Sequence, residues 1–179
     1  MKIRDFVQQQ MVLLLVQPFS KEKQVEYKSS LKKATRILVL FPGSELPWLE
    51  KTLFSAKSIF PDAAFTVLYT GNAEFRIKKQ TDVTLENLLL SKETYWTLSR
   101  SKRLNPFVKK RFDILLDLNP EYSLLGIYLC RLIRAPIRIG LDKSQSEKFY
   151  NFIYRGKTEA TYAEKVAGLV QFLRSFTTR

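Results

Sequence analysis

The hydrophobic positions of this chain alternate between short continuous apolar runs and longer segments with a helical period. Three apolar runs, at residues 37–41, 64–69 and 114–118, have the length of strands and lack polar alternation, which is typical of strands covered on both faces. A shorter run follows Pro136, at residues 137–139. Between these runs, apolar residues recur every three to four positions, as in helices that bury one side. The pattern predicts buried strands joined by amphipathic helices.

Three helices are expected between and after these strands. The first begins at Pro47, because proline fits the first turn of a helix, and Ser44 or Glu45 is expected to cap it. The second covers residues 121–133, and the third closes the domain at residues 162–176. Alternating strands and helices predict a single α/β domain of Rossmann-like type, with a mainly parallel sheet between two layers of helices.

The first residues do not follow this alternation. Residues 1–34 predict a basic helical extension, and residues 35–179 predict the Rossmann-like domain. Within the extension, residues 2–17 predict an amphipathic helix that ends at Pro18. This helix either packs on the domain or lies on a membrane surface or a partner protein.

The connection between the second and third apolar runs, residues 72–111, is long and rich in polar residues. Its pattern predicts one short helix near residues 84–90 and another near residues 93–103. Basic residues lie between and after these two segments.

The chain is strongly basic, with 30 Lys and Arg against 17 Asp and Glu and a net charge of +13. The excess lies in residues 1–36, with eight basic and three acidic side chains, and in residues 76–111, with ten and three. Such charge favours anionic partners, namely nucleic acid, acidic lipid or phosphorylated sugars, although a solvated surface is the alternative. The candidate anion-binding residues are Lys78, Lys79, Arg100, Lys102, Arg103, Lys109, Lys110 and Arg111.

The absence of histidine and the presence of a single cysteine limit the chemistry of the chain. Without histidine there is no His-dependent triad or His general base. Cys130 lies in an apolar run and is expected to be buried and inert. One cysteine forms no internal disulfide and no zinc site, and every glycine is isolated, so no phosphate-binding loop is present. We therefore expect neither a metal nor a cofactor.

These features also bear on location. No apolar segment reaches the roughly 20 residues that a membrane-spanning helix needs. The single cysteine favours a reducing compartment. The sequence therefore predicts a cytoplasmic protein, with the inner face of a membrane as the site of any peripheral attachment.

Polar side chains follow the strand at residues 114–118. Asp117 and Asn119 lie at its end, and ligands of α/β folds bind at the carboxyl ends of parallel strands. Two interpretations stay open for this pair. The side chains either contact a hydroxylated ligand or form a capping network for a helix that begins at Glu121.

Four stretches carry a resemblance to a known family in their order and spacing. They are RILVLFPGSELPWLEKTLFSAKSIFPDAAFTVLYTG at residues 36–71, RFDILLDLN at 111–119, LCRLIRAPIRIGLD at 129–142 and TYAEKVAGLVQFLRS at 161–175. Together they resemble the N-terminal, acceptor-side domain of the heptosyltransferase-like glycosyltransferases that build the lipopolysaccharide core.

The resemblance implies a role for the loop after the first strand. In that family an N-terminal half holds the acceptor and a C-terminal half holds the nucleotide sugar, and this chain corresponds to the first half alone. The family loop reads Gly-Asp, with the Asp as the proposed general base, whereas this loop reads Gly43, Ser44, Glu45. The resemblance makes Gly43 and Ser44 candidate ligand-binding residues and Glu45 a candidate catalytic residue, displaced by one position.

Three functions remain open on this basis. The favoured one is a non-catalytic, glycosyltransferase-derived binding or scaffold subunit whose partner is another protein. The second is the acceptor-binding half of a glycosyltransferase, with a partner chain that supplies the nucleotide-sugar donor. The third is a basic peripheral protein on an anionic membrane or on nucleic acid.

Overall fold

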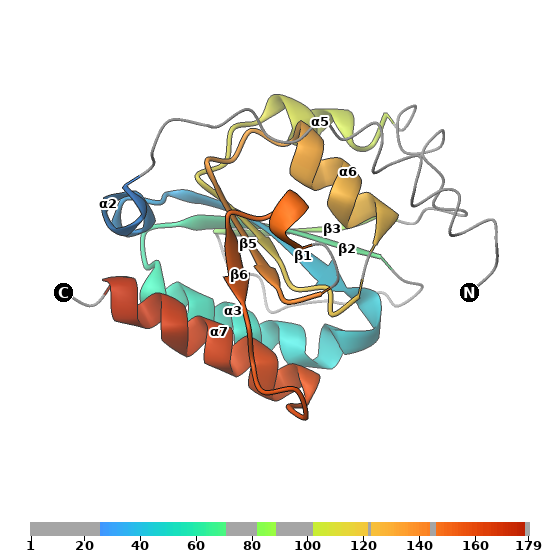
Figure 1. Cartoon of the computed structure of the whole chain (residues 1–179). Coiled ribbons are helices and arrows are strands. Elements are labelled where there is room, and N and C mark those ends of the chain that lie inside the picture. The colour runs from blue at the N-terminus through green and yellow to red at the C-terminus, as the bar shows by residue number, and fades with distance from the viewer. Residues whose placement is uncertain (1–25, 71–81, 89–101, 122, 144–145, 178–179) are drawn as a thin grey trace.

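The protein has an α/β architecture in which helices cover both faces of one sheet, which confirms the predicted Rossmann-like class (Figure 1). The structure is a computed structural model. The residues that it describes are 26–70, 82–88, 102–121, 123–143 and 146–177.

The centre of the domain is a six-stranded sheet with the order β3-β2-β1-β4-β5-β6, and each neighbouring pair is parallel. Parallel strands with helices on both faces are buried on both sides, which explains the continuous apolar runs of the sequence. The strands are β1 (Arg36–Pro42), β2 (Ala64–Thr70), β3 (Val83–Asn87), β4 (Ile114–Asp117), β5 (Ile137–Leu141) and β6 (Phe152–Tyr154).

The helices form two layers on opposite faces of the sheet. In Figure 1, α3 and α7 lie below the sheet and α5 and α6 lie above it. No helix in the described part of the chain is long and apolar enough to cross a membrane. The helical segments are α2 (Tyr27–Lys32), η1 (Gly43–Trp48), α3 (Leu49–Ile59), α5 (Asn105–Lys109), α6 (Leu124–Leu132), η2 (Ser146–Lys148) and α7 (Tyr162–Thr177).

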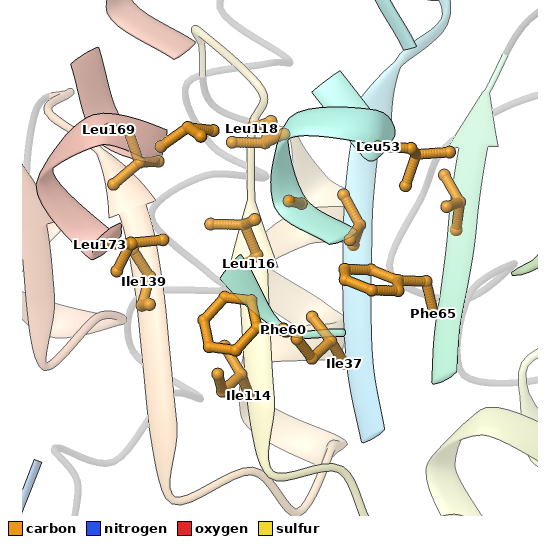
Figure 2. Packing of buried hydrophobic residues seen from close by; sticks show 14 of the residues in the cluster. Ile37, Leu53, Phe60, Phe65, Ile114, Leu116, Leu118, Ile139, Leu169 and Leu173 are labelled. Carbon is orange, nitrogen blue, oxygen red and sulfur yellow. The ribbon is translucent and has the colours of Figure 1, made fainter. Parts of the chain in front are cut away.

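Alternate residues of β1 pack into two hydrophobic clusters, one on each face of the sheet. Ile37 and Val39 belong to the cluster under α3 and α7, whereas Leu38 and Leu40 belong to the cluster under α5 and α6. Figure 2 shows the first cluster, in which isoleucines of the central strands face leucines of the helices, such as Leu173 of α7. The residues of β1 from Ile37 to Leu40 are therefore all buried, and β1 lies inside the sheet between β2 and β4.

The extension predicted at residues 1–34 is described only from residue 26 onward. There α2 packs against α7, and Leu31 and Ala34 are buried in the core cluster of the domain. The amphipathic helix predicted at residues 2–17 lies outside the described residues.

The helix predicted near residues 84–90 is wrong, because residues 83–87 form the edge strand β3. Val83 and Leu85 are half-buried while Thr84 and Glu86 are exposed, which is the period of two expected of a strand at an edge. Most of the helix predicted near residues 93–103 lies outside the described residues. The three-residue strand β6 was not predicted at all.

The predicted helix caps after β1 are also wrong. Pro47 lies inside the 3-10 segment η1, and the α-helix begins at Leu49. Neither start has a side-chain cap, so Ser44 and Glu45 do not cap it. By contrast, the closing helix has a capping box, in which the Thr161 amide donates to the Glu164 carboxylate at 2.8 Å.

Asp113 ties the start of β4 to the residues that enter β1. Its Oδ2 accepts hydrogen bonds from the backbone N–H of Thr35 at 2.8 Å and of Arg36 at 2.9 Å, and from the Thr35 hydroxyl at 3.0 Å. Burial raises the pKa of Asp113, but these hydrogen bonds outweigh it and the pKa is lowered overall. The carboxylate is thus a structural group at the amino ends of two central strands.

This lowered pKa predicts a dependence of stability on pH. A carboxyl group with a lowered folded-state pKa stabilises the protein above its unfolded-state pKa of about 4, and that stabilisation is lost as pH falls through the folded-state value. We expect Asp113→Asn to remove part of the acid-induced loss of stability, measured as the free energy of unfolding against pH. An unchanged pH profile in the variant would show that Asp113 makes no such contribution.

Candidate functional site

The order of strands places a candidate site between β1 and β4. The chain leaves β1 toward β2 on one side of the sheet and continues later with β4 on the other side. In open α/β sheets, ligands bind at the carboxyl ends of the strands at such a switch point. Gly43, Ser44 and Glu45 follow β1, while Asp117 pairs in register with Leu40 at the end of β4. The structure therefore brings the predicted loop and the predicted Asp117–Asn119 pair to the same edge.

Asp117 is a buried carboxylate at this edge with several hydrogen bonds. Its side chain is 1% exposed. Oδ1 accepts from the backbone N–H of Asn119 at 3.0 Å and from its Nδ2 at 2.6 Å. Oδ2 accepts from Lys143 Nζ at 3.0 Å and from the Tyr150 hydroxyl. These four hydrogen bonds occupy both carboxylate oxygens.

Lys143 supplies the counter-charge of this carboxylate. It follows β5, the neighbour of β4, and its side chain is 5% exposed. Its ammonium also donates to the carbonyl oxygen of Asn119 at 2.9 Å and lies 5.2 Å from the centre of the Tyr150 ring. The ion pair is buried and hydrogen-bonded on both sides, so each charge depends on the other.

The capping network considered for Asp117 and Asn119 is wrong. The helix α6 begins at Leu124, and Ser123 is its N-cap, whose hydroxyl accepts from the backbone N–H of Gly126 at 3.1 Å. Asp117 is engaged elsewhere, with Asn119, Lys143 and Tyr150. The reason is topological, because β5 is the neighbour of β4 in the sheet and brings Lys143 to the end of β4.

Two glycines leave room for this network. A Cβ atom at Gly126 would lie 3.0 Å from Asp117 Oδ2, which is closer than most such contacts. A Cβ atom at Gly140 would lie 2.7 Å from carbon atoms of the Tyr150 ring, so the ring would have to shift. The absence of side chains at these positions lets Tyr150 pack over β5 and reach Asp117.

Burial fixes the protonation of two neighbouring groups. Burial, followed by the charge of Asp117, raises the pKa of the Tyr150 hydroxyl, so it stays a hydrogen-bond donor. Burial also raises the pKa of the Cys130 thiol, again with the charge of Asp117 as the next cause. Cys130 is fully buried, as expected from its apolar run. Both groups act as neutral structural side chains.

A second part of the edge combines Glu45 with Tyr162. Glu45 is half-buried in η1, while Ser44 is exposed. The Tyr162 hydroxyl, at the start of α7, is buried and has no hydrogen-bond partner among the described residues. Burial and then the charge of Glu45 raise the pKa of Tyr162. This part of the edge holds an acid and a hydroxyl with unused hydrogen-bonding capacity. We call Glu45, Asp117, Asn119, Lys143, Tyr150 and Tyr162 together the switch-point site.

Sequence reasoning did not find Lys143, Tyr150 or Tyr162. Lys143 could have been proposed from the sequence, because it follows the predicted strand at residues 137–139. Residues after parallel strands lie at the carboxyl edge of the sheet, where ligands bind. Tyr150 and Tyr162 carried no such signal, since their places depend on the packing of β6 and α7. Among the described residues, no group of three or more Cys, Asp or Glu side chains is arranged to hold a metal ion.

The described members of the predicted anion-binding set are not part of the switch-point site. Lys109, Lys110 and Arg111 are exposed where the chain leaves α5 and approaches the amino end of β4, which is the opposite edge of the sheet. Lys102 and Arg103 are exposed before α5. The remaining members of the predicted set, Lys78, Lys79 and Arg100, lie outside the described residues.

A groove of about 400 Å³ runs between α3 and α7 on the outer side of one helical layer. Trp48 lines it and is 42% exposed, and Tyr162 lies in its wall and so connects it to the switch-point site. Trp48 ends η1, and Phe54 on α3 is 74% exposed. We call this feature the α3–α7 groove.

Comparisons with known proteins place the chain in a family. No curated protein matches the chain. Among solved structures, the chain is similar to the E. coli heptosyltransferase WaaC with ADP-2-deoxy-2-fluoro heptose, with a TM-score of 0.47, 14% sequence identity and coverage of 77% of this chain and 48% of that one. The chain thus spans about half the length of that enzyme. Residues 9–176 match the model of a family of unknown function, DUF6913, and the chain belongs to this family.

Proposed function

We propose that the chain is a non-catalytic binding subunit, derived from a glycosyltransferase, that holds a partner protein. The observation that carries this proposal is the burial and complete hydrogen bonding of the Asp117 carboxylate. A general base must reach the proton that it removes, yet this carboxylate is 1% exposed and both of its oxygens accept hydrogen bonds from the protein itself. Asp117 therefore holds the edge of the sheet together and has no free lone pair for chemistry.

The loop after β1 supports the same proposal. Ser44 is exposed, and the chain has no histidine that could activate its hydroxyl. The order of the four sequence stretches supports descent from the acceptor-side domain of a heptosyltransferase-like enzyme, while the loop lacks the Gly-Asp pair of that family. Glu45 is the remaining acid at this position.

The α3–α7 groove supports a protein as the ligand. Ala163 and Ala167 are small residues one turn apart on α7, so the groove has space for side chains of a partner. The charged residues that line the groove, Lys51 and Arg174, are both cationic. This combination fits an amphipathic helix whose apolar side chains enter the groove and whose flanking residues are acidic.

Substitution of Trp48 tests this proposal. We expect Trp48→Glu to lower retention of a stoichiometric partner by more than about tenfold, because buried aromatic anchors dominate interfaces and an acid would repel an acidic partner. The measurement is native affinity purification of the tagged chain from its own cells, read by quantitative mass spectrometry. Thr158→Glu, on an exposed loop outside the groove, adds the same charge as a control. Equal retention by both variants would contradict docking in the groove.

A second candidate function follows from Glu45 and Tyr162. An acid beside a buried hydroxyl that has no partner among the described residues is a suitable place for the hydroxyl group of an acceptor. On this alternative the chain is the acceptor-binding half of a glycosyltransferase, and a partner chain supplies the nucleotide sugar. Incubation of the purified complex with a panel of nucleotide sugars tests it, since Glu45→Gln is expected to abolish any transfer that depends on this acid.

A further inference from the structure

The amino ends of three neighbouring strands carry exposed arginines side by side. Arg36 begins β1, Arg111 precedes β4 and Arg134 precedes β5. The backbone connects them, because Arg36 accepts a hydrogen bond from the Asp113 amide at 2.8 Å, and Arg111 forms a parallel bridge with Arg134. The three arginines therefore follow one edge of the sheet, opposite the switch-point site.

Further cations extend this row from the adjoining helices. Lys32 and Lys33 lie at the end of α2, Lys109 and Lys110 at the end of α5, and Arg131 in the last turn of α6, and all are exposed. We call the whole set the basic edge: Lys32, Lys33, Arg36, Lys109, Lys110, Arg111, Arg131 and Arg134.

The charge of the basic edge is largely uncompensated. The ion pairs among the described residues are Lys57–Asp82, Lys143–Asp117 and Arg155–Asp142, and none includes a member of this set. The Asp113 carboxylate attracts Arg36 and so offsets one of the eight positive charges, while its hydrogen bonds go to Thr35 and the backbone of Arg36. A row of cations with so few acidic partners attracts a polyanion.

We propose that the basic edge binds the anionic surface of a membrane. Lipid headgroups present a plane of phosphates, which suits cations spread over the ends of α2, α5 and α6, and polybasic surfaces bind such planes by charge. Among the described residues, the large exposed apolar side chains are Tyr27, Trp48 and Phe54, of which Tyr27 belongs to the helix that leads into this edge. Tyrosine favours the membrane–water interface.

The sequence before α2 fits the same partner. Residues 2–17 contain the apolar run MVLLLV together with Lys2 and Arg4. In the sequence this segment precedes α2, whose last residue is Lys32. Stable attachment to a membrane surface takes two signals, such as an apolar insertion and a polybasic patch, and the sequence offers an apolar run in addition to the basic edge. Single-stranded nucleic acid would instead favour several exposed aromatic side chains along the row, and of the three large exposed aromatic side chains among the described residues only Tyr27 lies on a helix that adjoins it.

Vesicle flotation with the full chain tests the proposal. The probes are vesicles of phosphatidylcholine with phosphatidylglycerol in a two-to-one ratio, vesicles of pure phosphatidylcholine, and a duplex DNA. We expect binding to the anionic vesicles alone, weakened by salt, and a loss of more than about tenfold in Arg111→Glu/Arg134→Glu. The matched control is Arg155→Glu/Lys157→Glu, which changes the net charge equally at exposed positions away from the basic edge and should keep most of the binding.

Three outcomes would overturn the proposal. They are equal losses in the two charge-reversal variants, equal binding to neutral and anionic vesicles, and binding to DNA with none to vesicles. Thermal unfolding checks that the variants are folded, and Arg111→Gln/Arg134→Gln repeats the test without a reversed charge. Arg111 and Arg134 do not line the α3–α7 groove, so their variants should retain a partner protein as the wild type does. Loss of membrane binding and loss of partner binding can therefore be distinguished.

Discussion

Asp117→Asn is expected to lower the free energy of unfolding by about 3–5 kcal/mol, because it leaves the Lys143 ammonium buried without its counter-charge. The side chains of the pair are 1% and 5% exposed, and water cannot replace the lost carboxylate there. The Tyr150 hydroxyl would also lose its charged acceptor. Chemical denaturation of the purified chain measures the change.

The partner of the pair provides the control. Lys143→Met alone should also destabilise the protein, since it leaves the carboxylate buried with fewer donors. The double variant Asp117→Asn/Lys143→Met should be more stable than the sum of the two single losses predicts, because neither charge is then buried alone. If the two losses of stability simply add, Asp117 and Lys143 are not coupled. That result would contradict the conclusion that Asp117 has a structural role only.

Phe65→Ala is expected to lower the free energy of unfolding by a similar amount, about 3–5 kcal/mol. Phe65 lies on the interior strand β2, pairs in register with Ile37 of β1 and is 1% exposed. It packs in the cluster under α3 and α7, where Figure 2 shows it close to Ile37. Removal of its ring would leave a cavity that the rigid sheet cannot close. Chemical denaturation is again the measurement.

Phe54→Ala is the matched control, because it removes the same ring at an exposed position of α3, the helix that covers Phe65's face of the sheet. Phe54 lies on α3 but is 74% exposed, so its loss should change the free energy of unfolding by less than about 0.5 kcal/mol. It lies on the helix that forms one wall of the α3–α7 groove, so the same variant should weaken retention of a partner protein. A large loss of stability would mean that the ring is covered within the chain and would argue against an exposed binding surface.

The parts of the fold that could be predicted from the sequence are those with strong local patterns. The strands β1, β2 and β4 are mostly apolar runs because both faces of the sheet are covered, and α7 has buried apolar residues at a helical period. The edge strands β3 and β6 were missed because they are short and half-buried. A short segment of this kind has too few positions to distinguish a period of two from a helical one.

The candidate site was predictable only in part, for a related reason. Asp117 and Asn119 follow a recognisable strand, so their place at a carboxyl edge could be inferred. Their actual partners, Lys143 and Tyr150, are 26 and 33 residues away from Asp117 in the chain. Which distant residue meets Asp117 depends on the order of strands and on the open space at Gly140, and neither has a local signature.

The central claim is that this chain binds a partner protein and performs no chemistry at the switch point. The most direct measurement is native purification of the wild-type chain and of Glu45→Gln from their own cells, with each eluate assayed for a stoichiometric partner and for sugar transfer from nucleotide sugars. We predict the same partner in both eluates and transfer in neither. Transfer by the wild-type complex that Glu45→Gln abolishes, or a wild-type chain that is recovered alone, would contradict this account.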